Sequence, residues 1–346
     1  MKSTKLLSGL AGGLAISMLA LTAGQALAAD YVMKVGLEAP PPDPANPDHS
    51  RTPLAEFEQD LEAASGGRID VQIFWNGQLG KVDNVLNLVR GGQVEAEMAA
   101  DGHLAPYFSD IQILGVPYIF SSAEVAHEVL DGPAGQMLAE KLSEATDMYP
   151  LGWMENGGFR HFTANSPLNT VDDLKGLKIR TMSNPAHMEM VRALGASPTP
   201  IPWADLYTSL QTGVVDGEEN SLATFRVPRL EEVQKHIIMD GHVYAALTVV
   251  VSQKWLDSLP DDLRQAVLEA GQRMTERNRQ ISADSEASDR AYLESKDVTI
   301  VDLSTEEKAR FRDLTQAPVL EMVKDSVSQE IVDIFLSEVA KAESGQ

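Results

Sequence analysis

The sequence predicts an α/β fold with enough chain for two lobes. Strand-like and helix-like segments alternate from residue 31 to residue 301, which is typical of α/β proteins with largely parallel strand pairing. The chain has 346 residues and no cysteine, so it forms no disulfide and depends on packing for its stability. About 318 residues follow a predicted leader, enough for two hydrophobic cores.

The leader is predicted from the first 28 residues. Lys2 and Lys5 precede an apolar run from residue 6 to about residue 21, and Ala-Leu-Ala at 26–28 is a small-x-small cleavage site. This pattern predicts a cleaved secretory signal peptide at 1–28 and a periplasmic protein. No second run of about 18 apolar residues follows, so no direct membrane insertion is expected.

The predicted elements of the first part of the chain follow from hydrophobic periodicity. Alternating apolar residues predict strands, and apolar stripes with 3.6-residue spacing predict helices. Prolines at 40–47 predict a loop, either at the rim of a site or as a surface insertion, because proline suits neither a helix interior nor a central strand. The elements are a strand at 31–37, a helix ending at Ala64, a strand at 69–73, a helix at 83–90 and a strand at 94–100.

The second part of the chain repeats the alternation. Gly157 and Gly158 open a strand and form a flexible pair suited to a crossing between lobes. Residues 170–173 resemble a capping box, and Gly213 is placed to end a helix. The predicted elements are strands at 159–163 and 177–182, a helix at 202–212, a long helix at 260–295, a strand at 298–301 and two amphipathic helices.

Composition and motifs argue against several classes of function. The formal net charge is −23, and −25 without the two leader lysines, so nucleic acid and anionic membranes are poor partners. The common hydrolase, metalloprotease and nucleotide-binding motifs are absent, and the seven histidines lack metal-ligand spacing. We therefore expect that the protein is not an enzyme and binds no cofactor or metal. A hydrolase whose carboxylates come from distant segments stays an alternative. Glu218 and Glu219 would point to opposite faces of a strand, which indicates scaffold or surface positions.

Two arginines indicate binding of an anion instead. Arg180 lies near the C-terminal end of its strand, where open α/β sheets place a ligand crevice. Its guanidinium can grip a carboxylate with two parallel hydrogen bonds. Arg160 follows the glycine pair. Taken singly, each arginine could form a surface ion pair, Trp203 could be a packing residue, and Asn220 could belong to a turn.

Taken together, longer segments resemble a known family. The segments are GGRIDVQIFWNGQLG (66–80), VPYIF (116–120), ENGGFRHFT (155–163), LKGLKIRTM (174–182), LGASPTPIPWADLYTSLQTGVVDGEEN (194–220) and EVQKHIIMDGHVY (232–244). They resemble, in order, the DctP-type solute-binding proteins of tripartite ATP-independent periplasmic (TRAP) transporters. The resemblance implies a type II-like, two-lobed periplasmic binding protein. Each lobe would have a mixed β-sheet flanked by helices, and a long helix would span both.

The resemblance also implies a division of the chain and a set of partners. Lobe I is expected at 30–156 plus about 246–285, and lobe II at 157–245 plus about 286–346. The ligand would lie in the cleft between them. A small organic acid and the small and large membrane subunits of a TRAP permease are the implied partners.

The site residues are carried over from the family pattern. Arg180 is implied to clamp the ligand carboxylate, Arg160 to support the same group, and Asn220 to join the clamp. Trp203 would line the pocket, and Glu38, Asp101, His103 and Glu155 would contact the rest of the ligand.

The nature of the ligand follows from departures within that pattern. His103 and Thr224 stand where similar ectoine-binding members have aromatic rings, and Arg160 is present. Polar walls and two arginines favour a hydroxylated monocarboxylate such as a uronate or an aldonate. A hydroxy or keto acid, a sulfonate, an ectoine-like solute, or a role as a ligand-presenting sensor stay as alternatives.

Overall fold

The computed structural model describes residues 29–345, so the predicted signal peptide at 1–28 lies outside the described residues. The first half contains β1 (Tyr31–Gly36), α1 (Arg51–Ala64), β2 (Ile69–Phe74), α2 (Val82–Arg90), β3 (Ala96–Ala100), α3 (Asp101–Leu104), η1 (Ser109–Gly115), α4 (Ala123–Asp131), α5 (Pro133–Thr146), β4 (Met148–Pro150) and β5 (Met154–Ala164). These helices and strands follow the predicted alternation.

The second half completes the fold. Its elements are η2 (Val171–Leu174), β6 (Lys178–Thr181), α6 (Pro185–Ala193), β7 (Ser197–Pro200), η3 (Trp203–Asp205), α7 (Leu206–Gln211), β8 (Gly217–Asn220), α8 (Leu222–Arg226), η4 (Leu230–Glu232), β9 (His236–Ser252), α9 (Gln253–Ser258), α10 (Asp261–Glu294), β10 (Thr299–Asp302), α11 (Thr305–Ser326) and α12 (Gln329–Ser344). The helix predicted at 202–212 begins as a 3₁₀ turn at Trp203, because Pro202 keeps an extended backbone with ψ of 150°. Gly213 follows it with φ of +71°, as a helix-ending glycine should.

One mixed sheet runs through the molecule in the order β2-β1-β3-β9-β5-β8-β6-β7, and β4 and β10 also pair with β9. Pairing is parallel in β1–β2, β1–β3, β6–β7, β6–β8 and β9–β10. The prediction of largely parallel pairing is wrong at the centre, where β9 is antiparallel to β3, β4 and β5. The alternation of helices and strands along the chain does not specify which strands become neighbours. Here the long strands β5 and β9 run in opposite directions and therefore pair antiparallel.

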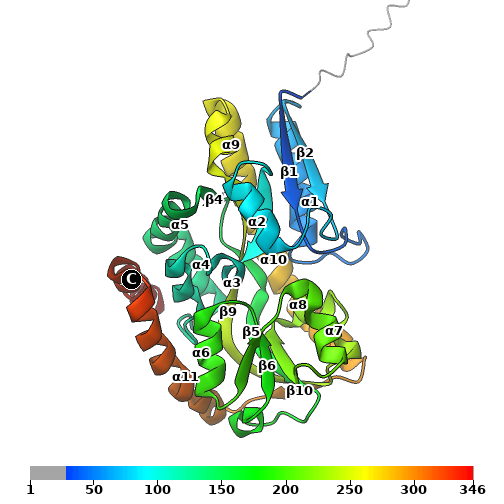
Figure 1. Cartoon of the computed structure of the whole chain (residues 1–346), viewed down its shortest axis with the longest axis vertical. Coiled ribbons are helices and arrows are strands. Elements are labelled where there is room, and N and C mark those ends of the chain that lie inside the picture. Colours follow the sequence, from blue (N-terminus) through cyan, green and yellow to red (C-terminus); the bar gives the residue numbers. More distant parts are fainter. Residues whose placement is uncertain (1–28, 346) are drawn as a thin grey trace, which may run out of the picture.

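The two longest strands, β5 and β9, connect the two lobes (Figure 1). Residues 247–251 of β9 pair with β3, and residues 236–239 pair with β10. The ladder between β5 and β9 is irregular between Glu155 and Phe159, where Gly157 and Gly158 have φ of +80° and +89°. A Cβ on Gly157 would lie 2.5 Å from Ser221 Oγ, so both the backbone and the space there require glycine.

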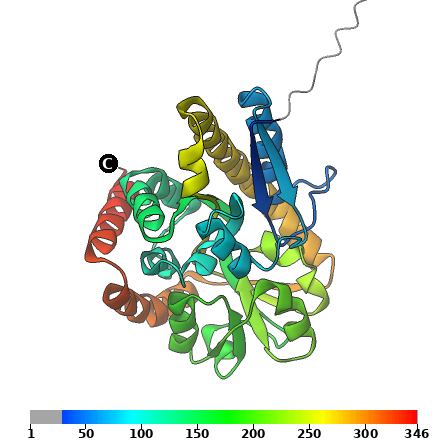
Figure 2. The same cartoon turned by 45° about the horizontal axis from the view of Figure 1, so that its top comes forward.

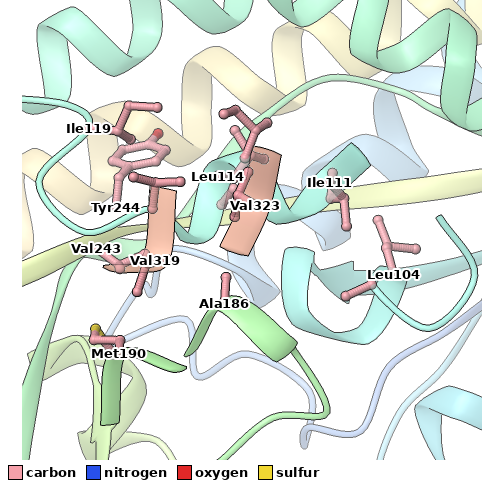
Figure 3. Close-up of a cluster of buried hydrophobic side chains, with 14 of the residues drawn as sticks. Leu104, Ile111, Leu114, Ile119, Ala186, Met190, Val243, Tyr244, Val319 and Val323 are labelled. Atoms are coloured by element: carbon pink, nitrogen blue, oxygen red, sulfur yellow. The ribbon is translucent and has the colours of Figure 1, made fainter. Parts of the chain in front are cut away.

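Three buried hydrophobic clusters hold the fold together. One joins β1, β2 and α1 to the first half of α10, and a smaller one joins α7, α8 and β10 to its end. The largest cluster brings η1, α6, β9 and α11 together, as Figure 3 shows for Leu114, Met190, Val243 and Val319. Helix α10 contacts α1, β5 and α8 and so spans both lobes, as expected (Figure 2).

Two further features concern the chain as a whole. Helix α12 packs against α4 and α5, whereas the division expected from the resemblance assigns these helices to different lobes. Within residues 29–345, no helix combines the length and the apolar character needed to cross a membrane.

Candidate ligand-binding site

A cavity of about 100 Å³ lies among residues from both parts of the sheet. Its lining comes from the ends of β1, β3, β6 and β8, from β5 and β9, and from the first turns of α2, α3 and α8. The structure brings together here six of the residues predicted for the site, namely Arg180, Arg160, Asn220, Trp203, Glu38 and His103.

Arg180, on β6, is the principal cation of this cavity. Its side chain is almost fully buried, and its Nε donates to the Ile201 carbonyl at 2.9 Å. Within the described part of the chain, the two terminal nitrogens have no hydrogen-bond acceptor and the guanidinium has no ion-pair partner. Burial lowers the pKa of Arg180 to about 10, and it remains charged at neutral pH. A buried guanidinium with both terminal nitrogens free suits a bidentate anion.

Arg160 is held by a protein carboxylate, unlike Arg180. Its Nε and Nη2 donate to the Glu219 carboxylate on the paired strand β8. His242 lies on the other side of Glu219, with Nε2 3.2 Å from that carboxylate and Nδ1 2.7 Å from Asp240. Although burial opposes the charge, Asp240 and Glu219 raise the pKa of His242 to about 9. This ionic chain fixes Arg160 at the cavity wall while its Nη1 has no acceptor within residues 29–345.

The acidic pair on β8 is therefore part of the scaffold. Glu218 and Glu219 are both fully buried, so the surface alternative for them was wrong. Burial opposes ionisation of Glu219, but the charge of Arg160 holds its pKa well below the usual range. Burial and the neighbouring Glu219 raise the pKa of Glu218 to about 7. Glu218 accepts from Asn220 Nδ2 at 2.6 Å and so orients the Asn220 amide beside the cavity.

The remaining predicted lining residues contribute in different ways. The Arg180 guanidinium lies 5.9 Å from the centre of the Trp203 ring, within reach of a cation–π contact. Glu38 accepts from the Val82 backbone N–H at 3.2 Å. His103 Nδ1 accepts from the Ala100 N–H, which places the proton of the neutral ring on Nε2. Burial, Arg180 and Arg160 lower the pKa of His103 to about 3, so the ring stays neutral.

Asp101 and Glu155 do not line this cavity. Asp101 is buried at the start of α3, where Asn184 donates to it at 3.3 Å and His187 Nε2 lies 3.6 Å away. Glu155 contacts His127 and lines a separate cavity of about 760 Å³. The next residue, Asn156, lines the predicted site instead.

A polar group that the predicted site did not include lies in the same cavity. Asn156 Oδ1 accepts from His49 Nε2 at 3.0 Å and from the Thr224 hydroxyl at 3.1 Å. His49 follows the proline-rich loop, so the end of this loop belongs to the site. The loop carries no periodicity that would have indicated this. Asn156 stands directly before the glycine pair, which is the one signal that could have drawn attention to it.

An outer hollow of about 480 Å³ shares Glu38, Ala39 and Trp203 with the cavity. Lys81, before α2, lines it, and Lys81 Nζ lies 2.8 Å from Asp205 Oδ2 at the end of η3. This exposed ion pair joins the two parts of the chain that face each other across the outer hollow. Within residues 29–345, no group of three or more histidine or acidic side chains is arranged to hold a metal ion.

Comparisons with known proteins agree with this architecture. Residues 43–326 match the family described as bacterial extracellular solute-binding protein, family 7. The chain is 32% identical over 335 residues to the C4-dicarboxylate-binding periplasmic protein DctP of Rhodobacter capsulatus, covering 96% of each chain. It is 30% identical over 231 residues to the 2,3-diketo-L-gulonate-binding periplasmic protein YiaO of Escherichia coli, covering 67% of this chain and 70% of YiaO.

Solved structures show the same fold. The sugar acid binding protein DctPAm from Advenella mimigardefordensis, in complex with galactonate, is 29% identical, with a TM-score of 0.83 and coverage of 90% of this chain and 98% of that one. A TRAP periplasmic solute binding protein from Polaromonas sp. JS666, bound to D-erythronate, is 29% identical, with a TM-score of 0.80 and coverage of 88% and 98%. The chain therefore belongs to family 7 of the bacterial extracellular solute-binding proteins, the DctP family of TRAP transporter solute-binding proteins.

Proposed function

We propose that this TRAP solute-binding protein captures a small organic acid in the periplasm and delivers it to the small and large membrane subunits of a TRAP permease. The observation that carries the proposal is the buried Arg180 guanidinium, whose terminal nitrogens have no acceptor within residues 29–345. The acids named for the relatives, galactonate, D-erythronate, 2,3-diketo-L-gulonate and C4-dicarboxylates, all carry a carboxylate. Family members are binding proteins, and no catalytic step is proposed.

In this proposal the ligand carboxylate binds Arg180 through two parallel hydrogen bonds. The Asn220 amide and the free Nη1 of Arg160 complete the clamp, and the Trp203 ring covers it. Asp101 and Glu155 act indirectly, because each is held by a histidine outside the cavity lining. Residues 30–156 with about 246–285 would move as lobe I, and residues 157–245 with about 286–346 as lobe II, except that α12 packs against α4 and α5 and would move with lobe I.

Isothermal titration with Arg180→Lys tests the clamp. Removing one partner of a buried charge pair typically costs about 2–5 kcal/mol, or roughly 30- to several-thousand-fold in affinity. An ammonium group cannot reproduce the planar fork, so lysine is expected to lose most of the affinity for the organic acid bound by the natural protein. Arg192→Lys, on the exposed side of α6, is the matched control and should bind normally. Natural affinity in Arg180→Lys would refute the clamp.

Uptake by proteoliposomes containing the two membrane subunits tests the second half of the proposal. Solute uptake should require this protein and fall with Arg180→Lys in step with binding. A protein that binds the acid but does not support uptake would instead be a ligand-presenting sensor.

A further inference from the structure

The walls of the ligand cavity are less polar than the sequence indicated. The carboxylate clamp occupies one part of the surface, and most of the remainder is aliphatic or aromatic. The apolar lining residues are Leu37, Ala39, Val82, Met98, Ala100, Met182, Trp203, Val227 and Leu247. When a ligand lies against these side chains, burying its carbon atoms favours binding, and burying a hydroxyl without a hydrogen-bond partner costs binding free energy.

The volume of the cavity favours a small ligand. Its volume is about 100 Å³. Benzene, with about six non-hydrogen atoms, occupies an engineered protein cavity of about 150 Å³. Roughly six to eight non-hydrogen atoms are therefore on the scale of this partly open inner cavity, and a hexonate, with about thirteen, would have to extend toward the outer hollow.

Few hydrogen-bonding groups remain for the ligand beyond the clamp. Glu38 accepts from the Val82 N–H through Oε1 and keeps Oε2 as an acceptor, and the Ser50 hydroxyl donates to Asp48 at 3.2 Å. His49 and Thr224 both donate to Asn156 Oδ1. The N–H donors of the lining that have no acceptor within the described residues include His103 Nε2 and Asn156 Nδ2. Both suit a carbonyl or hydroxyl oxygen of the ligand.

We infer that the ligand is a compact aliphatic 2-oxo or 2-hydroxy monocarboxylate, of roughly four to six carbons with at most one further oxygen, rather than a hexose-derived acid. The inference rests on the proposed function, because it assumes the carboxylate clamp at Arg180. His103 Nε2 would donate to the oxygen on carbon 2. The aliphatic walls would enclose the rest of the carbon chain.

Isothermal titration of the mature protein with four named acids tests this. The probes are 2-oxo-3-methylbutanoate, 2-hydroxy-3-methylbutanoate, D-galactonate and D-glucuronate. Each buried hydroxyl without a partner costs about 1–3 kcal/mol, so the branched acids should bind at least about 100-fold more tightly than either sugar acid. Equal or tighter binding of a sugar acid, sensitive to Arg180→Lys, would overturn the inference and leave the proposed function intact. Failure of all four acids, together with a broad panel of other carboxylates, would overturn both.

A substitution in the wall gives a second test. Leu247→Asn keeps the branched shape and the number of side-chain heavy atoms on β9 but adds a hydrogen-bonding group to the apolar lining. It should weaken binding of 2-oxo-3-methylbutanoate at least tenfold. The affinity for D-galactonate relative to that acid should rise. Met182→Gln at another wall position should have the same effect, and serves where Leu247→Asn does not fold. Leu336→Asn, at an exposed site on α12, is the control. Unchanged selectivity in a folded wall variant would contradict the inference.

Discussion

Two adjacent glutamates on β8 should lose very different amounts of stability on the same substitution to glutamine. Glu218 and Glu219 are equally buried, but only Glu219 pairs with Arg160 and His242. The charge of Arg160 overcomes burial and keeps the pKa of Glu219 low, whereas burial and Glu219 raise the pKa of Glu218 to about 7. At pH 6, glutamine would therefore replace an ionised carboxylate at one position and a mainly protonated carboxyl at the other.

The expected magnitudes follow from this difference. Glu219→Gln removes one partner of a buried ionic network, which typically costs about 3–5 kcal/mol of folding stability. Glu218→Gln preserves an oxygen that can accept from Asn220, so the loss should stay near that of one perturbed hydrogen bond, about 1 kcal/mol.

Urea unfolding at pH 6 and pH 8 measures the loss of stability in each variant and its dependence on pH. Because the folded pKa of Glu218 is raised above 4.5, the stability that its protonation provides is full below pH 4.5 and is lost as pH rises through 7. Glu218→Gln removes this loss, so the variant should gain stability relative to the natural protein between pH 6 and pH 8. Equal destabilisation by the two variants at pH 6, or a larger effect at Glu218, would refute the assignment of an ionised Glu219 and a mainly protonated Glu218.

Three further outcomes are expected. Binding of an anionic ligand beside Glu218 should favour its protonated form, so titration calorimetry should show affinity falling as pH rises through about 7, by at most tenfold per pH unit, and Glu218→Gln should flatten this profile. Lys81→Ala removes the exposed ion pair with Asp205, so calorimetry at low salt should show a small loss of affinity that disappears at high salt, where the pair is already screened. Gly157→Ala forces a Cβ against Ser221 Oγ at a positive φ, so thermal unfolding should show a clear loss of stability, whereas unchanged stability would contradict the strain assigned there.

The parts of the site that were predicted from the sequence lie on short, regular segments. Arg180 and Asn220 each sit at the end of a strand, where direction follows from strand geometry. Glu155, predicted to contact the ligand, lines a different cavity. Successive side chains of a strand point to opposite faces, so neighbouring residues can line different cavities, and Asn156 lines the one beside Arg180.

The other differences come from contacts between distant segments. His49 reaches the site at the end of an aperiodic loop, and its partner Asn156 lies 107 residues away. The antiparallel centre of the sheet likewise depends on which strands meet, which local periodicity does not encode. Helices and strands were thus largely predictable, whereas the partners of the buried charges were not.

The Arg180 guanidinium, which has no ion-pair partner within residues 29–345, also affects when the cleft closes. A closed cleft without a ligand encloses a cation that the protein offsets only in part, through Glu218, and an incompletely paired buried charge is costly. A carboxylate removes this cost only when it arrives, so the charge itself opposes premature closure. If Arg180 clamps the ligand as proposed, the same residue helps to make the closed shape a signal that a ligand is bound.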